Sequence, residues 1–120
     1  MNAEKNINIL GKEVRLRYCA ATETGYEQIS GNSIDIFIGK KDKPSEAKTI
    51  DYIQLAIAAM AAAYGRNGED VPLKTEEIMY DCTPKEITAM ILAVVELRAA
   101  WYELPSVISN EQKSEDSEKN

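Results

Sequence analysis

Few residues of this sequence have the types and spacing that catalysis or metal binding requires. The chain contains no histidine, which removes the commonest general base, the usual nucleophilic triads and most zinc sites. Cys19 and Cys82 lack metal-ligand spacing, and two cysteines do not form a disulfide framework. The remaining candidates are the carboxylates Glu23, Glu27, Asp35, Asp51, Glu76 and Glu77. None has a recognisable partner, and most complement helix dipoles. We therefore expect no catalytic, cofactor-binding or metal-binding residue and no enzymatic activity.

Charge and hydropathy exclude two further classes of partner. The formal net charge of -6 argues against a nucleic-acid binder, which needs a dense basic face. The basic run "GKKDK" at 39–43 lacks the glycine spacing and hydroxyl residue of a P-loop, so a solvated loop is favoured. The N-terminus lacks the apolar run of a signal peptide, and the longest uncharged run, 52–65, is short for a membrane span. These features predict a cytoplasmic protein that binds neither nucleic acid nor membrane.

The N-terminal residues alternate in the way a β-hairpin does. The segment "INILGKEVRLRY" contains Val14, Leu16 and Tyr18 in alternation with charged residues, which predicts one buried and one wet face. Gly11-Lys12 suits a two-residue type II′ turn. We therefore expect a hairpin over residues 6–18. An isolated hairpin is marginal in water, so its apolar face must pack on the segment that comes after it in the chain.

Helical patterns account for most of the remaining chain. A short helix over 20–30 has Thr22, Tyr26 and Ile29 on one stripe and ends before Gly31. The segment "SIDIFI" is either a third strand or an apolar edge that leads into the charged loop. Further helices are expected at about 47–64, 75–80 and 84–103. The last begins with "TPKE", a capping box with proline at the first helical position.

These elements predict an α+β fold that is mostly α, with the N-terminal β-hairpin packed on a small helical domain of three to four helices. Residues 1–104 are long enough for one domain and too short for two. Residues 105–120, "PSVISNEQKSEDSEKN", are mostly polar and predict a disordered tail.

Four residues are candidates for binding a partner protein. Leu55 and Ala59 lie on the side of the 47–64 helix opposite its main apolar stripe, which predicts that both sides of this helix meet protein. Arg98 fits either an interfacial ion pair or an arginine whose stem packs while its head reaches solvent. Trp101 fits either an interface anchor or a lid on the domain's own core. Leu92 is a single leucine among polar positions and carries no argument by itself.

The run "INILGKEVRLRYCAATETGYEQISGNSI" at 7–34 resembles the N-terminal signature of tail assembly chaperones of long-tailed phages and prophages. The shared features are a glycine-turn hairpin and a short helix with an aromatic-glutamate pair, here Tyr26-Glu27, and a terminal glycine, here Gly31. Cys19 stands where such proteins tend to have threonine or serine. For residues 46–104 the resemblance is only architectural.

The resemblance implies a homo-oligomeric, non-enzymatic protein without a cofactor. Its partners would be the tape-measure protein and the tail-tube protein: it would keep the first soluble and help recruit subunits of the second. Two other functions fit the same residues. The first is a virion structural or tail-completion adaptor protein, and the second is a small cytosolic protein-interaction module.

Overall fold

The computed structural model describes residues 3–104, and its N-terminal part is an antiparallel hairpin. Strand β1 (Ala3–Ile9) pairs with β2 (Lys12–Tyr18), and Ile9 opposite Lys12 closes the ladder. The hairpin therefore starts three residues earlier than predicted. Val14, Leu16 and Tyr18 are buried, as predicted.

The hairpin turn differs from the predicted one. Its two loop residues are Leu10 and Gly11, both with positive φ (52° and 75°), which is the type I′ geometry rather than type II′ at Gly11-Lys12. A left-handed leucine is unfavourable in isolation. Here the Leu10 N–H donates to Glu86 Oε2 at 2.8 Å. That hydrogen bond joins the turn to the start of the last helix and holds the uncommon conformation.

Helix α1 (Ala20–Ser30) follows the hairpin directly. Thr22 Oγ1 accepts the Cys19 N–H at 3.1 Å and donates to the Arg17 carbonyl at 2.7 Å, so this buried threonine organises the helix start. Gly31 ends the helix with φ 77°, as its predicted C-terminal position requires. Tyr26 is buried as predicted, but Ile29 is about half exposed.

The segment predicted as a strand or an apolar edge is a short 3₁₀ helix, η1 (Ile34–Phe37). Ser33 caps it by accepting the Asp35 N–H at 3.1 Å. Phe37 lies edge-on to the rings of Tyr26 and Tyr52, each at 5.0 Å between centroids. This aromatic packing holds the segment in a compact helical turn, and the segment does not join the two-stranded sheet. The following residues, 39–44, are exposed, as the charged loop predicted.

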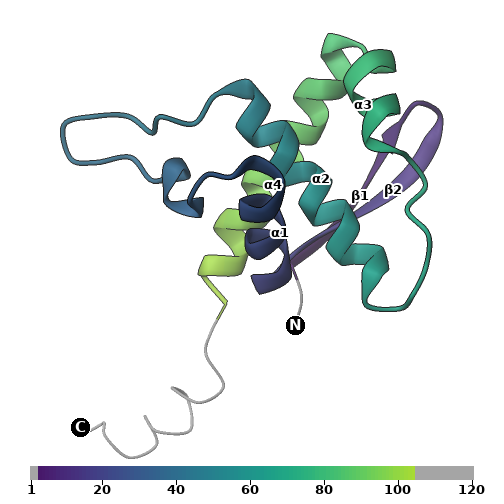
Figure 1. Cartoon of the computed structure of the whole chain (residues 1–120), viewed down its shortest axis with the longest axis horizontal. Helices are drawn as coiled ribbons and strands as arrows, with labels where there is room; N and C mark the ends of the chain where they lie inside the picture. The colour runs from purple at the N-terminus through teal and green to yellow at the C-terminus, as the bar shows by residue number, and fades with distance from the viewer. Residues whose placement is uncertain (1–2, 105–120) are drawn as a thin grey trace, which may run out of the picture.

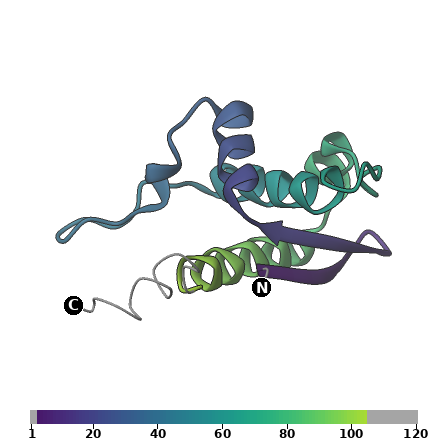
Figure 2. The same ribbon diagram turned by 90° about the horizontal axis from the view of Figure 1, so that it is seen from below.

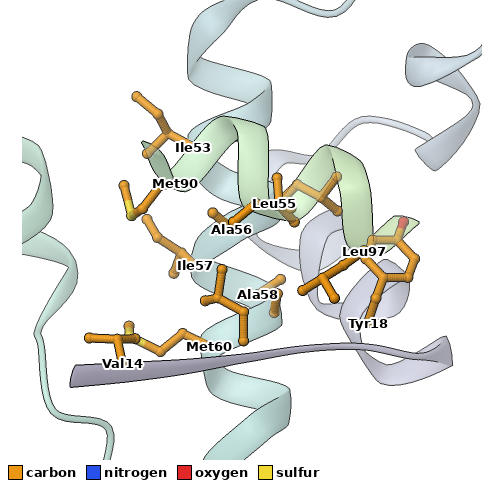
Figure 3. Packing of buried hydrophobic residues seen from close by; sticks show 14 of the residues in the cluster. Val14, Tyr18, Ile53, Leu55, Ala56, Ile57, Ala58, Met60, Met90 and Leu97 are labelled. Carbon is orange, nitrogen blue, oxygen red and sulfur yellow. The ribbon is translucent and has the colours of Figure 1, made fainter. Parts of the chain in front are cut away.

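Helix α2 (Thr49–Gly65) is the centre of the domain. It packs against α1 on one side and against β2 and α4 on another, as Figures 1 and 2 show. Figure 3 shows its part of the core, whose members on this helix are Ile53, Leu55, Ala56, Ile57, Ala58, Ala59 and Met60. Both apolar sides predicted for this helix therefore meet the same chain, although Ile50 and Ala61 remain exposed.

The C-terminal part consists of α3 (Thr75–Asp81) and α4 (Pro84–Tyr102). The predicted capping box is present: Thr83 Oγ1 accepts the Glu86 N–H at 3.2 Å, and Glu86 Oε1 accepts the Thr83 N–H at 2.9 Å. Met90, Ala93, Val94 and Leu97 form the buried face of α4. In Figure 2, α4 runs along the hairpin on the side of the molecule away from α1, and Lys5 of β1 pairs with Glu96.

The architecture confirms the predicted fold class, α+β and mostly α, with an N-terminal hairpin packed on helices. None of the helices within residues 3–104 is long and apolar enough to cross a membrane. The polar tail predicted for 105–120 lies outside the described residues.

Candidate partner-binding surfaces

Two of the four predicted partner-binding residues are inside the domain. Leu55 and Ala59 are both 0% exposed and belong to the central core. They stabilise the packing of α2, and a partner cannot reach them while the fold is intact. The prediction that Leu55 and Ala59 bind a partner is therefore wrong for the folded domain. The sequence pattern could not distinguish a helix covered by its own chain from a helix covered by another.

Arg98 and Trp101 lie together at the end of α4, in a cluster of aromatic rings. The Trp101 ring is 5.3 Å from that of Tyr18 and 4.9 Å from that of Tyr102. The Arg98 guanidinium lies 4.8 Å above the Tyr102 ring and 5.9 Å from the Phe37 ring. Trp101 is therefore a lid on the domain's own core. Arg98 has no salt bridge within residues 3–104 and is held by cation–π contacts instead.

Glu23 connects this aromatic cluster to α1. Its Oε2 accepts the hydroxyl protons of Tyr18 at 2.8 Å and Tyr102 at 2.5 Å. Burial raises the pKa of both phenols, and the bond to Glu23 raises it further. The two phenols therefore stay protonated and keep donating. The cluster fastens the end of α4 to the start of α1, which is a structural role.

Asp51 is a buried carboxylate at the start of α2. Its Oδ1 accepts the Tyr26 hydroxyl at 2.8 Å and the Asn32 amide at 3.3 Å, and its Oδ2 accepts the Lys48 N–H at 2.8 Å. Burial by itself would raise its pKa, but these hydrogen bonds outweigh burial and lower it. Asp51 thus stays ionised and holds α1 and the segment after it against α2.

A shallow apolar groove of about 550 Å³ runs between α1 and α2. We call it the α1–α2 groove, and its lining residues are Arg17, Cys19, Ala21, Gly25, Gln28, Ile29, Ala58, Ala61, Ala62, Gly65 and Arg66. Most of them are small, so the backbones of the two helices lie close and leave a concave surface. A Cβ added at Gly25 would lie 3.4 Å from the Ala58 Cβ. The groove's only charged lining residues, Arg17 and Arg66, are both basic.

The groove's charge is opposite to that of the protein as a whole, which is -6. Arg17 has Glu4 at 3.8 Å, whereas Arg66 lies exposed at the end of α2. A partner helix with an apolar stripe and neighbouring acidic residues would match both the shape and the charge of this surface. Sequence reasoning missed the groove because its residues come from two helices whose crossing it could not place.

The second surface is the outer face of α4. Leu92, Val95 and Tyr102 are 58%, 42% and 55% exposed. Thr88 and Ala99 are also exposed, and together the five residues form what we call the α4 stripe. Their spacing of four, three, four and three residues is that of a helix–helix seam. This spacing was readable in the sequence, and it shows that Leu92 is not an isolated exposed leucine.

A further cleft, of about 620 Å³, lies between η1 and the loop after it. Three lysines and three acidic residues line it: Lys40, Lys41, Lys43, Asp35, Asp42 and Glu46. The three positive and three negative side chains give this lining no net formal charge. Within residues 3–104, no group of three His, Cys, Asp or Glu side chains is placed to hold a metal ion.

A scan of protein-family models and searches of curated proteins and solved structures return no match to this chain.

Proposed function

We propose that this protein is a non-enzymatic tail assembly chaperone of a phage or prophage. In the host cytoplasm it would bind the tape-measure protein, keep it soluble, and help recruit tail-tube subunits. The observation that carries this proposal is the open apolar α1–α2 groove. One wall of the groove is α1, which lies within the stretch that resembles these chaperones.

The proposed client is the tape-measure protein. A long amphipathic helical protein exposes more apolar surface than it can bury alone, and such surface aggregates unless it is covered. Helix-in-groove recognition covers it through apolar side chains at i, i+3 and i+4. The small residues Gly25, Ala61 and Ala62 leave room for such side chains. The exposed Arg66 would favour client segments with an acidic residue beside the apolar stripe.

Co-expression with the cognate tape-measure protein tests the proposal. We expect the wild type to keep the client soluble and to co-purify with it. Apolar burial is screened little by salt, so binding should survive moderate ionic strength. Ala61 is exposed and lines the groove. Ala61→Trp should therefore fill the groove and abolish binding without disturbing the core.

Two matched controls test whether the groove is the surface involved. Arg66→Glu should weaken client binding, whereas Lys41→Glu, the same charge change on the exposed loop, should not. Ala100→Trp adds the same bulk as Ala61→Trp at an exposed position of α4 and should leave binding unchanged. If Ala61→Trp folds and still solubilises the client, the groove is misassigned.

A failure of the wild type to bind the client would overturn the proposed function itself. The protein's presence in purified particles would then favour the virion structural or tail-completion adaptor. Its absence from particles, together with no client binding, would favour a small cytosolic interaction module. A slippery run near the 3′ end of the gene, followed by a very long helical reading frame, would favour the chaperone.

A further inference from the structure

The α4 stripe faces away from the interior of its own domain. With about 100° of rotation per residue, its centre lies about 170° from the centre of the buried face of α4. The buried face is formed by Met90, Ala93, Val94 and Leu97. Within residues 3–104 the middle of the stripe is uncovered, since Leu92 and Val95 are 58% and 42% exposed. At its end, Tyr102 is 55% exposed although its hydroxyl donates to Glu23 and the Arg98 guanidinium lies over its ring. A surface helix of a monomer normally carries polar residues at such positions.

We propose that the α4 stripe is a self-complementary interface through which two copies of this chain pair antiparallel. The stripe continues one step towards the start of α4, to Lys85, which is exposed. In an antiparallel pair, successive seam positions of one helix face the same positions of the other in reverse order. Leu92 then faces Val95 of the second copy, and Thr88 faces Ala99. The two outermost layers each place Lys85 against Tyr102.

The charges at the two ends of α4 select this orientation. Lys85 lies near the start of the helix and Glu103 at its end, and neither forms a salt bridge within residues 3–104. The antiparallel register brings Lys85 level with Glu103 of the second copy, once at each end of the dimer. A parallel pair would instead place Lys85 beside Lys85 and Glu103 beside Glu103, which is repulsive.

This charge pattern argues for a second copy rather than a different helix. An unrelated client would need its own matching acid and base at both ends of α4, whereas a second copy supplies them by symmetry. A twofold contact of this kind is isologous and closed, so it forms a dimer and not a filament. Glu96, on the flank of the stripe, is already paired with Lys5, which lowers its repulsion of the second copy.

The dimer proposal does not depend on the proposed function, but a dimer would affect how the protein binds a client. Figure 2 shows most of α4 on the side of the molecule away from α1, and α4 meets α1 at its end, where Tyr102 donates to Glu23. No residue of α4 lines the α1–α2 groove, so pairing through the middle of α4 leaves both grooves open. Two grooves on one particle could engage one long client at successive segments. The second contact would then form at a high effective concentration.

Sedimentation of the full chain from low micromolar to millimolar concentration tests the interface. We expect a monomer–dimer equilibrium, with a dissociation constant of roughly micromolar order because the interface is small. Leu92→Asp and Val95→Asp should each weaken dimerisation at least about tenfold by placing a charge in the seam. Met79→Asp is the matched control, since Met79 is 45% exposed on α3, and should leave dimerisation unchanged.

A charge swap tests the register. Lys85→Glu and Glu103→Lys should each weaken the dimer by roughly threefold to tenfold, the range of exposed ion pairs with added repulsion. The double variant should restore wild-type dimerisation. Both single changes place a charge that interacts favourably with the α4 helix dipole. A weaker dimer therefore cannot be attributed to a weaker helix, and circular dichroism measures the helix content of each variant. A wild type that stays monomeric, a Leu92→Asp variant that dimerises normally, or a charge swap without rescue would each overturn the proposal.

Discussion

The α1–α2 groove and the α4 stripe are both apolar and both open, yet they fit different partners. The groove is concave because small residues such as Gly25, Ala61 and Ala62 line it, and its charges are of one sign. The stripe is convex because Leu92, Val95 and Tyr102 project from one helix, and opposite charges lie at its two ends. Side-chain size and charge arrangement, more than hydrophobicity, therefore distinguish a surface for a foreign helix from a surface for a second copy.

The largest expected effect comes from Asp51, because it holds the walls of the groove together. Asp51→Ala removes a buried acceptor and leaves the Tyr26 hydroxyl without its partner. We expect a loss of about 3 kcal/mol in the free energy of unfolding, typical of hydrogen bonds to a buried charged group. Urea denaturation measures it, with Asp42→Ala on the exposed loop as the control. A loss below about 1 kcal/mol would mean that other contacts fix α1 on α2.

Stability should also depend on pH through the same carboxylate. Hydrogen bonds outweigh burial and hold the pKa of Asp51 below its ordinary value of 3.8. The unfolded chain therefore takes up the proton first as the pH falls. The stabilisation is complete above about pH 4 and is lost as the pH falls through the lower pKa of the folded state. Glu86 acts in the same direction, because the Thr83 and Leu10 N–H groups lower its pKa.

Denaturation midpoints measured from pH 7 down to pH 2 test this dependence. The loss of stability in acid should be smaller in Asp51→Asn, whose side chain does not titrate. If the acid dependence of Asp51→Asn equals that of the wild type, Asp51 is not the group responsible.

We expect an intermediate loss of stability from a change at the start of α4. Thr83→Ala removes the oxygen that accepts the Glu86 N–H and should cost about 1 kcal/mol. Because the cap belongs to the helix that carries the α4 stripe, client binding in the groove should be unaffected. Thr24→Ala, at an exposed position of α1, is the control and should be neutral or slightly stabilising, because alanine favours a helix more than threonine does. Equal midpoints for Thr83→Ala and wild type in thermal denaturation would contradict the assigned cap.

The smallest effect should come from Gly25 in the groove. An added Cβ would lie 3.4 Å from the Ala58 Cβ, an ordinary contact, and alanine favours a helix by up to about 1 kcal/mol over glycine. Gly25→Ala should therefore leave stability unchanged or raise it slightly. Gly31→Ala provides the contrast: space is open there, but φ is +77°, so strain should lower stability by about 1 kcal/mol. A destabilised Gly25→Ala would mean that the helix crossing is tighter than described.

Local chemistry explains which features could be predicted from the sequence. The Thr83–Glu86 capping box, the left-handed Gly31 and the buried face of β2 depend on residues close in the chain. The hairpin turn was predicted one residue too late, because the Glu86 contact that holds Leu10 comes from 76 residues away. The 3₁₀ helix was missed for the same reason, since Phe37 is fixed by rings from α1 and α2.

The sequence by itself determined that α2 must be covered on two sides and that the chain is a hairpin on helices, because hydrophobic periodicity reports which faces avoid water. It did not determine which elements cover them. Leu55 and Ala59 are buried in the core of their own domain. Leu92 and Val95 are also apolar but remain exposed. Only the tertiary structure decided this, because burial depends on where α1, α4 and the hairpin pack around α2, and those contacts join residues far apart in the chain.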